Sequence, residues 1–230
     1  MKNAIILLAA GLGKRMGGGT PKALRPLLNR PILHWTLRSL ESCPSIHSII
    51  LVVPPGTESH FNSARFRKEH KKVYAAVAGG RERTDSTRLA MKALPRDADW
   101  VGIHDAARPF VTSAQLQAVF RAAKFTGCAI LAVPSKDTVK IARQGAMKID
   151  RTVPRERCWL AQTPQVFRRN IVEKLHAKRR KAKFTDDASI AESMGLAVTL
   201  VPGSYENIKI TTPQDLELAQ KILKKRRKNG

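Results

Sequence analysis

The stretch AIILLAAGLGKRMG at residues 4–17 decides the fold of this chain. Its apolar half predicts a buried β-strand over Asn3–Ala9, because a short apolar run bounded by a glycine-rich turn is typical of an inner strand of a sheet. Its second half is a turn with Lys14 and Arg15 close by, and glycines let backbone N–H groups point toward phosphate oxygens. The stretch therefore predicts an α/β protein with an anion site at the carboxyl end of its first strand.

Apolar, β-branched runs alternate with amphipathic stretches through most of the 230 residues. The expected strands are Asn3–Ala9, Ser48–Val53, Val73–Ala78, Trp100–His104, Cys128–Val133 and a late one near Ala197–Val201. The expected helices are Ile32–Ser42, Ser59–Glu69, Arg83–Leu94, Ser113–Phe125, one that begins near Asp186 and one that begins at Pro213 after an N-cap at Thr212. This alternation predicts a single Rossmann-like domain over residues 1–230, with a mostly parallel sheet and helices on both faces.

One region breaks the alternation. Residues 134–165 contain two short polar β segments, Asp137–Ala142 and Lys148–Val153, on either side of a turn at residues 143–145. We expect a β-hairpin arm that projects from the sheet. Such an arm exposes unpaired strand edges, so docking against a second copy of the chain is the natural way to cover it, and we expect a homodimer.

Cysteine usage and the N-terminal sequence bear on the compartment. Cys43, Cys128 and Cys158 are odd in number, widely spaced and without a CxxC pair, so the sequence suggests neither a disulfide framework nor a zinc site. The apolar run after Lys2 stops at Gly11 and is followed by cations, which argues against a signal peptide. No other apolar stretch approaches the length of a membrane span. We therefore expect a cytoplasmic protein without a membrane partner.

The balance of charge is the unusual feature of the composition. Lysine and arginine number 42 against 18 acidic residues, a formal net charge of +24. Much of the excess lies in three runs, at residues 65–72, at 174–183 and in the basic tail at 224–230. With two tyrosines and no interleaving of aromatic and basic residues, the sequence offers no stacking platform for single-stranded nucleic acid. We interpret the runs as mostly solvated faces, with nonspecific nucleic-acid affinity as a side effect.

Three clusters near strand ends carry the chemistry. HDAARP at residues 104–109 places Asp105 after an apolar strand, where a carboxylate could help to hold a magnesium ion; the alternative is a helix cap or an ion pair with Arg108. GGRERTDS at residues 79–86 offers small and hydroxyl groups to a base or ribose, unless it is only a capped helix start. Beside the first turn, Arg15 and Lys22 are two cations that suit a triphosphate whose pyrophosphate must leave. These clusters indicate an enzyme that handles a nucleoside triphosphate.

The order of these and further blocks resembles one enzyme family. The blocks are AAGLGKRM, PK, GGRERTDS, HDAARP, DTVK, TPQVF, TDDAS and ENIKIT, and they run from about Asn3 to Leu223. In this order they are similar to the cytidylyltransferases that act on 2-C-methyl-D-erythritol 4-phosphate in the non-mevalonate isoprenoid route. The resemblance implies transfer of CMP from CTP to that substrate with magnesium as cofactor. It also implies in-line attack on the α-phosphorus, release of pyrophosphate and no covalent enzyme intermediate.

The resemblance further implies a set of site residues. The catalytic cations would be Arg15, Lys22, Arg155 and Lys209. The CTP site would include Ala10, Gly11, Gly13, Gly80, Ser86, Asp105 and Ala106, with Asp105 at the metal. The methylerythritol phosphate would be held by Thr138, Arg155, Thr163 and Arg108. Because the arm swaps across a homodimer in this family, Arg155 would serve the neighbouring subunit's site, although Arg157 is close enough to take that role.

Other functions stay open at this point. A sister enzyme that uses ribitol 5-phosphate shares the fold, CTP and much of the block order, although the DTVK and QTPQ segments favour the methylerythritol enzyme. A sugar-1-phosphate nucleotidyltransferase would share only the first loop. An RNA-binding protein that has lost catalysis would show damage at Arg15, Lys22 or Asp105, and all three are intact. Two departures, Ala23 where the family commonly has glutamine and the additional charge of Arg81, leave room for a shifted substrate preference.

Overall fold

The computed structural model describes residues 2–11, 13, 19–145, 147–177 and 184–228. The strands of its central sheet are β1 (Lys2–Leu8), β4 (Ser48–Val53), β5 (Val73–Ala78), β6 (Ala98–Asp105), β7 (Cys128–Pro134), β10 (Trp159–Arg168) and β11 (Thr199–Pro202). They lie in the order β11-β7-β10-β6-β1-β4-β5, and β10 alone runs antiparallel to its neighbours. The predicted mostly parallel α/β sheet is therefore confirmed.

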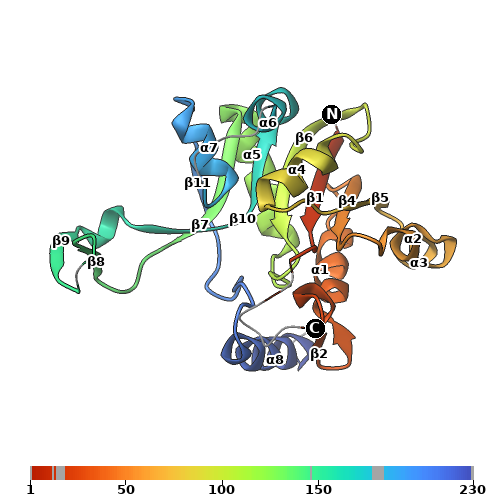
Figure 1. Ribbon diagram of the computed structural model, residues 1–230, viewed down its shortest axis with the longest axis horizontal. Helices are drawn as coiled ribbons and strands as arrows, with labels where there is room; N and C mark the ends of the chain where they lie inside the picture. The colour runs from red at the N-terminus through yellow and green to blue at the C-terminus, as the bar shows by residue number, and fades with distance from the viewer. Residues whose placement is uncertain (1, 12, 14–18, 146, 178–183, 229–230) are drawn as a thin grey trace.

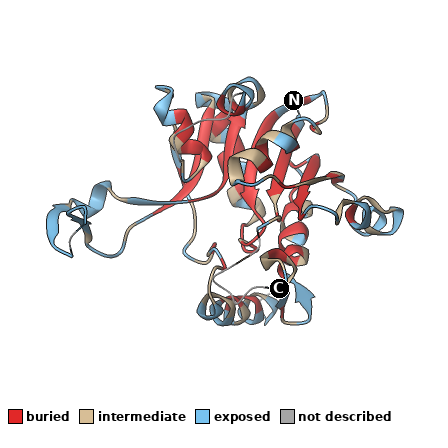
Figure 2. Cartoon of the chain, in the orientation of Figure 1, coloured by how far each residue is buried: buried red, intermediate tan, exposed pale blue. Residues whose placement is uncertain are grey.

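Helices cover both faces of this sheet (Figure 1). They are α1 (Ile32–Glu41), α2 (Glu58–Asn62), α3 (Ala64–Glu69), α4 (Arg83–Met91), α5 (Ser113–Thr126), α6 (Arg169–His176), α7 (Asp187–Ser193) and α8 (Pro213–Lys228). Side chains alternate across a strand, so β1 feeds two cores. Ile5 and Leu7 pack in one cluster with α1 and α5, whereas Ala4 and Ile6 pack in another with α4, α6 and α7. Figure 2 shows this burial concentrated in the sheet.

The C-terminal helix α8 begins as its sequence predicts. The backbone N–H of Asp215 donates to Thr212 Oγ1 at 3.3 Å, which caps the helix. Helix α8 continues through Lys228, so residues 224–228 of the basic tail are helical. Its apolar side, including Ile222, packs against Phe110 near the carboxyl edge of the sheet.

Two predicted elements differ from the structure. Strand β10 lies in the central sheet, whereas the sequence assigned residues as far as 165 to the arm. Pro164 cannot donate to a ladder and argues against an inner strand, but a register shift between Ala161 and Gln165 removes it from the regular pairing. The helix expected over residues 59–69 is two helices, because Ser63 is extended and caps α3 by accepting the Phe66 N–H.

The arm itself is present as a two-stranded antiparallel hairpin of β8 (Val139–Ala142) and β9 (Ile149–Val153). It extends away from the body of the protein (Figure 1), and Figure 2 shows it almost wholly exposed. Apolar side chains on the arm and at the root of β10 are exposed as well, including Ile149 at 64% and Leu160 at 53%. The hairpin therefore has little packing of its own in a single chain.

The order of the strands creates a crevice at one place. The chain passes from β1 to β4 and β5 on one side and then returns to β6 on the other side of β1. Parallel pairing sets Leu8 at the end of β1 beside Asp105 at the end of β6. Ligands of open α/β sheets bind at such a reversal point, outside the carboxyl ends of the strands. None of the helices in the described segments combines the length and the apolar character that a membrane span needs.

Candidate active site

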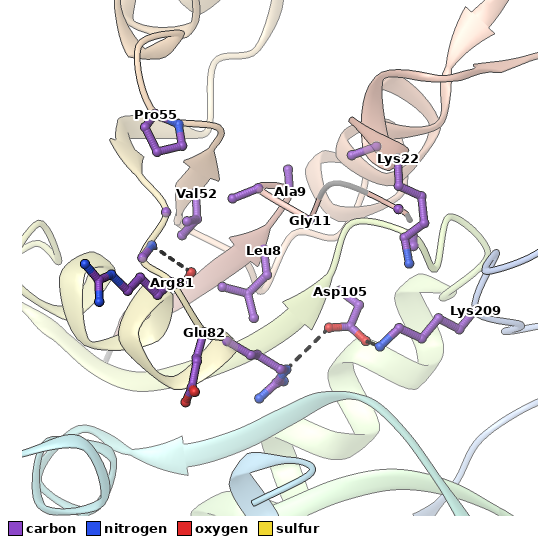
Figure 3. A pocket seen from close by; sticks show the side chains of 18 residues that line it. Leu8, Ala9, Gly11, Lys22, Val52, Pro55, Arg81, Glu82, Asp105 and Lys209 are labelled. Atoms are coloured by element: carbon purple, nitrogen blue, oxygen red, sulfur yellow. Dashed lines mark hydrogen bonds and ion pairs between the residues drawn. The ribbon is translucent and has the colours of Figure 1, made fainter. Parts of the chain in front are cut away.

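A cavity of about 750 Å³ opens at this reversal point (Figure 3). The ends of β1, β4, β5 and β6, the segments that follow them and the segment after β11 line it: Leu8, Ala9, Ala10, Gly11, Gly13, Lys22, Ala23, Val52, Pro55, Gly79, Gly80, Arg81, Glu82, Arg83, Ser86, Asp105, Ala107 and Lys209. This volume is in the usual range for a small-molecule site. Lys22 and Lys209 approach from the side opposite Pro55 and Arg81 (Figure 3). The cavity therefore combines apolar and glycine residues with cations, Lys22 and Lys209 on one side and Arg81 on the other.

The first turn holds Lys22 at the cavity. Gly13 has φ +64°, and a Cβ there would lie 2.9 Å from the Cβ of Lys22, so glycine is needed both for the conformation and for the close approach. The N–H of Lys22 donates to the carbonyl of Gly11 at 3.1 Å. Arg15 falls outside the described residues. Among the predicted residues of this turn, the structure thus brings Ala10, Gly11, Gly13 and Lys22 together.

Asp105 is the centre of charge in the cavity. Its Oδ2 lies 2.7 Å from Lys209 Nζ and 3.9 Å from Arg108 Nε, and its Oδ1 lies 3.6 Å from Arg83 Nε. Burial alone would raise the pKa of this carboxyl, but Arg83, Lys209 and Arg108 together lower the pKa far below its usual range. Asp105 is therefore an ionised carboxylate held by three cations.

His104 and Thr163 support the backbone at Asp105. The His104 Nε2 lies 3.1 Å from the carbonyl of Arg108, so this nitrogen carries the proton and donates. The Thr163 hydroxyl then donates to His104 Nδ1 at 3.0 Å and accepts the Asp105 N–H at 3.1 Å. Thr163 is 5% exposed and lies off the cavity lining. Burial lowers the pKa of His104 to about 4, in keeping with a neutral ring.

The Asn207-Ile208-Lys209 segment is anchored beside this network. Asn207 is fully buried, and its Nδ2 donates to Gln162 Oε1 at 3.2 Å and to the carbonyl of Thr163 at 3.1 Å. Arg108 Nη1 donates to the Asn207 carbonyl at 2.8 Å. These bonds set where Lys209 emerges. Ala106 is buried and donates its N–H to the carbonyl of Leu8, while Ala107 next to it lines the cavity.

The turn after β5 closes the other side of the cavity. A Cβ on Gly79 would lie 2.4 Å from the Cβ of Ala10, so this turn packs directly on the turn after β1. The N–H of Gly80 donates to Ser86 Oγ at 3.0 Å. The acceptor position of Ser86 is used in this bond, and its hydroxyl proton can point into the cavity.

The predicted arm residues do not join the cavity. Thr138 and Arg155 are exposed, and neither lines the cavity of its own chain. Arg155 Nη1 donates to the carbonyl of Lys136 within the arm at 3.1 Å. The structure therefore separates these two residues from the predicted residues of the nucleotide turn.

Sequence reasoning missed Arg83 as a site residue. Arg83 begins α4, lines the cavity and reaches both Asp105 and the buried Asp187. Its position in the GGRERTDS block was a signal, but its two partners lie far away in the chain. Among the described residues, no group of three or more His, Cys, Asp or Glu side chains could hold a metal.

A Rossmann-like sheet with a cation-lined cavity at its reversal point defines the broad class, a phosphate-handling α/β enzyme. Comparison with known proteins narrows this class. The family model described as IspD, 2-C-methyl-D-erythritol 4-phosphate cytidylyltransferase, matches residues 3–225. The chain therefore belongs to the IspD family of cytidylyltransferases.

Individual relatives align with nearly the whole chain. A 2-C-methyl-D-erythritol 4-phosphate cytidylyltransferase of Pelotomaculum thermopropionicum is 43% identical over 228 residues, which cover 98% of this chain and 95% of that protein. A bifunctional enzyme IspD/IspF of Desulforudis audaxviator is 46% identical over 221 residues, 95% of this chain and 56% of that protein. The crystal structure of 4-diphosphocytidyl-2C-methyl-D-erythritol synthase from Anaerococcus prevotii matches with a TM-score of 0.83 and 31% identity, covering 97% of this chain and 96% of that one.

Proposed function

We propose that this chain transfers CMP from CTP to 2-C-methyl-D-erythritol 4-phosphate and releases pyrophosphate, the activity of its family. The observation that carries the proposal is the ionised Asp105, held by three cations in a 750 Å³ cavity where the strand order reverses. A phosphate oxygen of the acceptor attacks the α-phosphorus, and the bond from that phosphorus to the leaving pyrophosphate breaks in line. Such transfers depend on positioning and charge, so no protein nucleophile is needed.

Lysine and arginine side chains would stabilise the charge of the transition state. Lys22 and Lys209 both line the cavity on one side, and we assign Arg15 to the same role. Lys209 is 40% exposed and rests on Asp105. A triphosphate would compete with Asp105 for the Lys209 ammonium, so we propose that Lys209 moves from the carboxylate to the phosphates when CTP binds.

The donor set fits magnesium that arrives with its nucleotide. Mg²⁺ is usually held by one or two carboxylates together with substrate phosphates and water, rather than by a cage of protein ligands. Asp105 supplies one ionised carboxylate at the cavity. We propose that Asp105 holds the ion, which when bound would neutralise charge on the phosphates. In its absence, the three neighbouring cations balance the carboxylate.

Backbone and hydroxyl groups would recognise cytosine. Ala10, Gly11, Gly13, Gly80 and Ser86 line the cavity at the turns after β1 and β5 and at α4, and a flat base would fit between the two turns. Since Ser86 Oγ already accepts the Gly80 N–H, its own proton is available for an acceptor atom of the base.

We propose that the acceptor site is completed by a second copy of this chain. Arg108 and Thr163 lie beside Asp105, but Thr138 and Arg155 are exposed on the arm. A homodimer would bury the apolar side chains of the arm and bring Arg155 of one copy to the cavity of the other. The three cysteines are free, which suits a reducing compartment, and we place the reaction in the cytoplasm.

Pyrophosphate release is the test of this function. With CTP and magnesium, the purified chain should release pyrophosphate faster with 2-C-methyl-D-erythritol 4-phosphate than with ribitol 5-phosphate at equal concentration. Faster release with ribitol 5-phosphate would keep the nucleotide chemistry and overturn the acceptor. No release with either acceptor would overturn the proposed reaction.

A further inference from the structure

Behind Asp105 lies a buried polar network that the proposed reaction does not use. Arg83 joins it to the cavity: its Nε lies 3.6 Å from Asp105 Oδ1, and its Nη1 is ion-paired with Asp187 Oδ2. Three blocks of sequence meet here, because Arg83 comes from GGRERTDS, Gln165 from TPQVF and Asp187 from TDDAS. Arg83 and Asp187 are 104 positions apart.

Asp187 is fully buried and fully partnered. Its side chain is 0% exposed, and its second oxygen lies 2.9 Å from His176 Nε2. Its backbone N–H and that of Ala188 both donate to Gln165 Oε1 at 3.0 Å, while Gln165 Nε2 donates to Asp186 Oδ2 at 2.7 Å. These contacts therefore fix the position of the Asp187 carboxylate and of the first residues of α7.

A buried ion pair of this kind is weak evidence for stabilisation of the fold, although removing one partner is destabilising. Removing two charges from water costs several kcal/mol each, and apolar side chains of similar volume often pack at least as well. Burial would raise the pKa of Asp187, yet Arg83 and His176 lower it, so the group is ionised. The pair holds the Arg83 guanidinium between two carboxylates, with about a quarter of that side chain exposed to the cavity. This geometry is better suited to orienting the Arg83 side chain than to stabilising the fold.

Of the cations around Asp105, Arg83 is anchored from behind. Lys209 is 40% exposed and would leave for the phosphates of CTP, whereas Arg108 Nε lies 3.9 Å away. Arg83 would then be the nearest cation left on the carboxylate. The contact of Arg83 with Asp105 depends on the ion pair between the Arg83 guanidinium and Asp187.

We propose that Asp187, supported by His176 and Gln165, is a positioning residue for Arg83, and that Arg83 sets the orientation of the Asp105 carboxylate toward the nucleotide. The inference rests on the proposed role of Asp105 in holding magnesium. It explains the network by the chemistry of the site rather than by folding. In groups of this kind, outer partners of a metal ligand influence metal affinity and turnover without touching substrate.

The test compares Asp187→Asn, Arg83→Met and the double variant. Each single change should lower kcat by roughly 10- to 100-fold in the presence of magnesium. Because the two residues act as one unit, the double variant should lose no more than Arg83→Met alone. Glu192→Gln, an exposed acid-to-amide change in the same helix, is the matched control and should leave kcat unchanged.

Calorimetry of CTP binding in the absence of acceptor distinguishes a positioning role of Asp187 from a purely structural one. Wild-type protein should bind Mg·CTP more tightly than CTP in EDTA, and Asp187→Asn should lose most of that difference while binding CTP in EDTA as before. A lower unfolding temperature with an unchanged difference and unchanged kcat would overturn the inference, as would additive losses in the double variant. Asp105→Asn separates the two ideas: if it keeps the full magnesium effect, the metal role of Asp105 itself is wrong.

Discussion

The cavity at the ends of β1 and β6 and the hairpin of β8 and β9 differ in how they hold their charged residues. In the cavity, Asp105 is 11% exposed at its side chain and meets three cations: Arg83 and Lys209 come from distant parts of the chain, and Arg108 lies three residues further along it. On the hairpin, the Lys140 ammonium donates to the Thr152 hydroxyl at 2.8 Å, and both residues are exposed. Exposed contacts of this kind contribute little, because water competes for them.

The difference separates a region that is fully packed within a single chain from one that a single chain leaves exposed. The groups proposed to bind CTP are positioned by the fold of a single chain, since buried neighbours leave them few alternatives. The arm leaves Arg155 and apolar side chains such as Ile149 exposed. We therefore expect changes in the cavity to act within one chain and changes on the arm to act between two.

The largest effect should come from Lys22 in the cavity. Lys22→Ala should lower kcat by roughly 100- to 1,000-fold, because its charge matters most in the transition state. The dissociation constant of CTP should change far less. Steady-state kinetics and calorimetry measure the two effects, with the exposed Lys92→Ala as the matched control. Equal losses in CTP binding and in kcat/KM, with kcat itself intact, would contradict this role.

A heterodimer of two different variants tests whether Arg155 acts in the cavity of the other chain. If Arg155 serves the neighbouring cavity, a dimer of one Lys22→Ala chain and one Arg155→Ala chain should keep about half of the wild-type rate, because one of its two sites is intact. Two affinity tags allow this heterodimer to be purified and assayed. The control carries both changes in one chain opposite a wild-type chain, and it should be inactive. The reverse pattern of activities would show that Arg155 works in its own chain.

The buried histidine beneath the cavity gives a pH-dependent effect of intermediate size. The folded chain holds the pKa of His104 near 4, against 6.5 in an exposed histidine, because burial penalises its charged form. As the pH falls below 6.5 the unfolded chain takes up a proton that the folded chain does not, so the free energy of unfolding decreases. We expect a loss of roughly 2 kcal/mol between pH 7 and pH 5.

Urea unfolding at the two pH values, without metal or nucleotide, measures this loss. In His104→Gln that part of the pH dependence should disappear, whatever the stability of the variant at pH 7. An unchanged pH dependence in the variant would mean that other groups cause it.

The smallest effect should come from the basic tail. Arg226 Nη2 lies 3.0 Å from Glu206 Oε2, but the two side chains are 33% and 39% exposed. Arg226→Met should cost about 1 kcal/mol or less in the free energy of unfolding, and kcat should change by less than about 3-fold. Urea unfolding and steady-state kinetics measure both quantities. A loss of kcat as large as that of Lys22→Ala would show that the tail controls Lys209 and belongs to the cavity.

Local features of the site could be predicted, whereas long-range ones could not. Gly13, Lys22 and Asp105 follow strands that have a clear apolar pattern, and the structure places all three on the cavity lining. Strand β10 was missed because Pro164 and its polar neighbours contradict the pattern of an inner strand. The partnership of Arg83 with Asp187 has no local signature at all.

The sequence by itself determined the first strand, its glycine-rich turn and the alternation that makes an α/β sheet, because these depend on backbone preferences and on the period of apolar residues. Its block order also identified the family. Only the tertiary structure decided that β10 runs antiparallel between β6 and β7, and that Asp105 meets Lys209 and Arg83. The physical reason is that these contacts join segments far apart in the chain, and the packing of the two cores on the sheet brings such segments together.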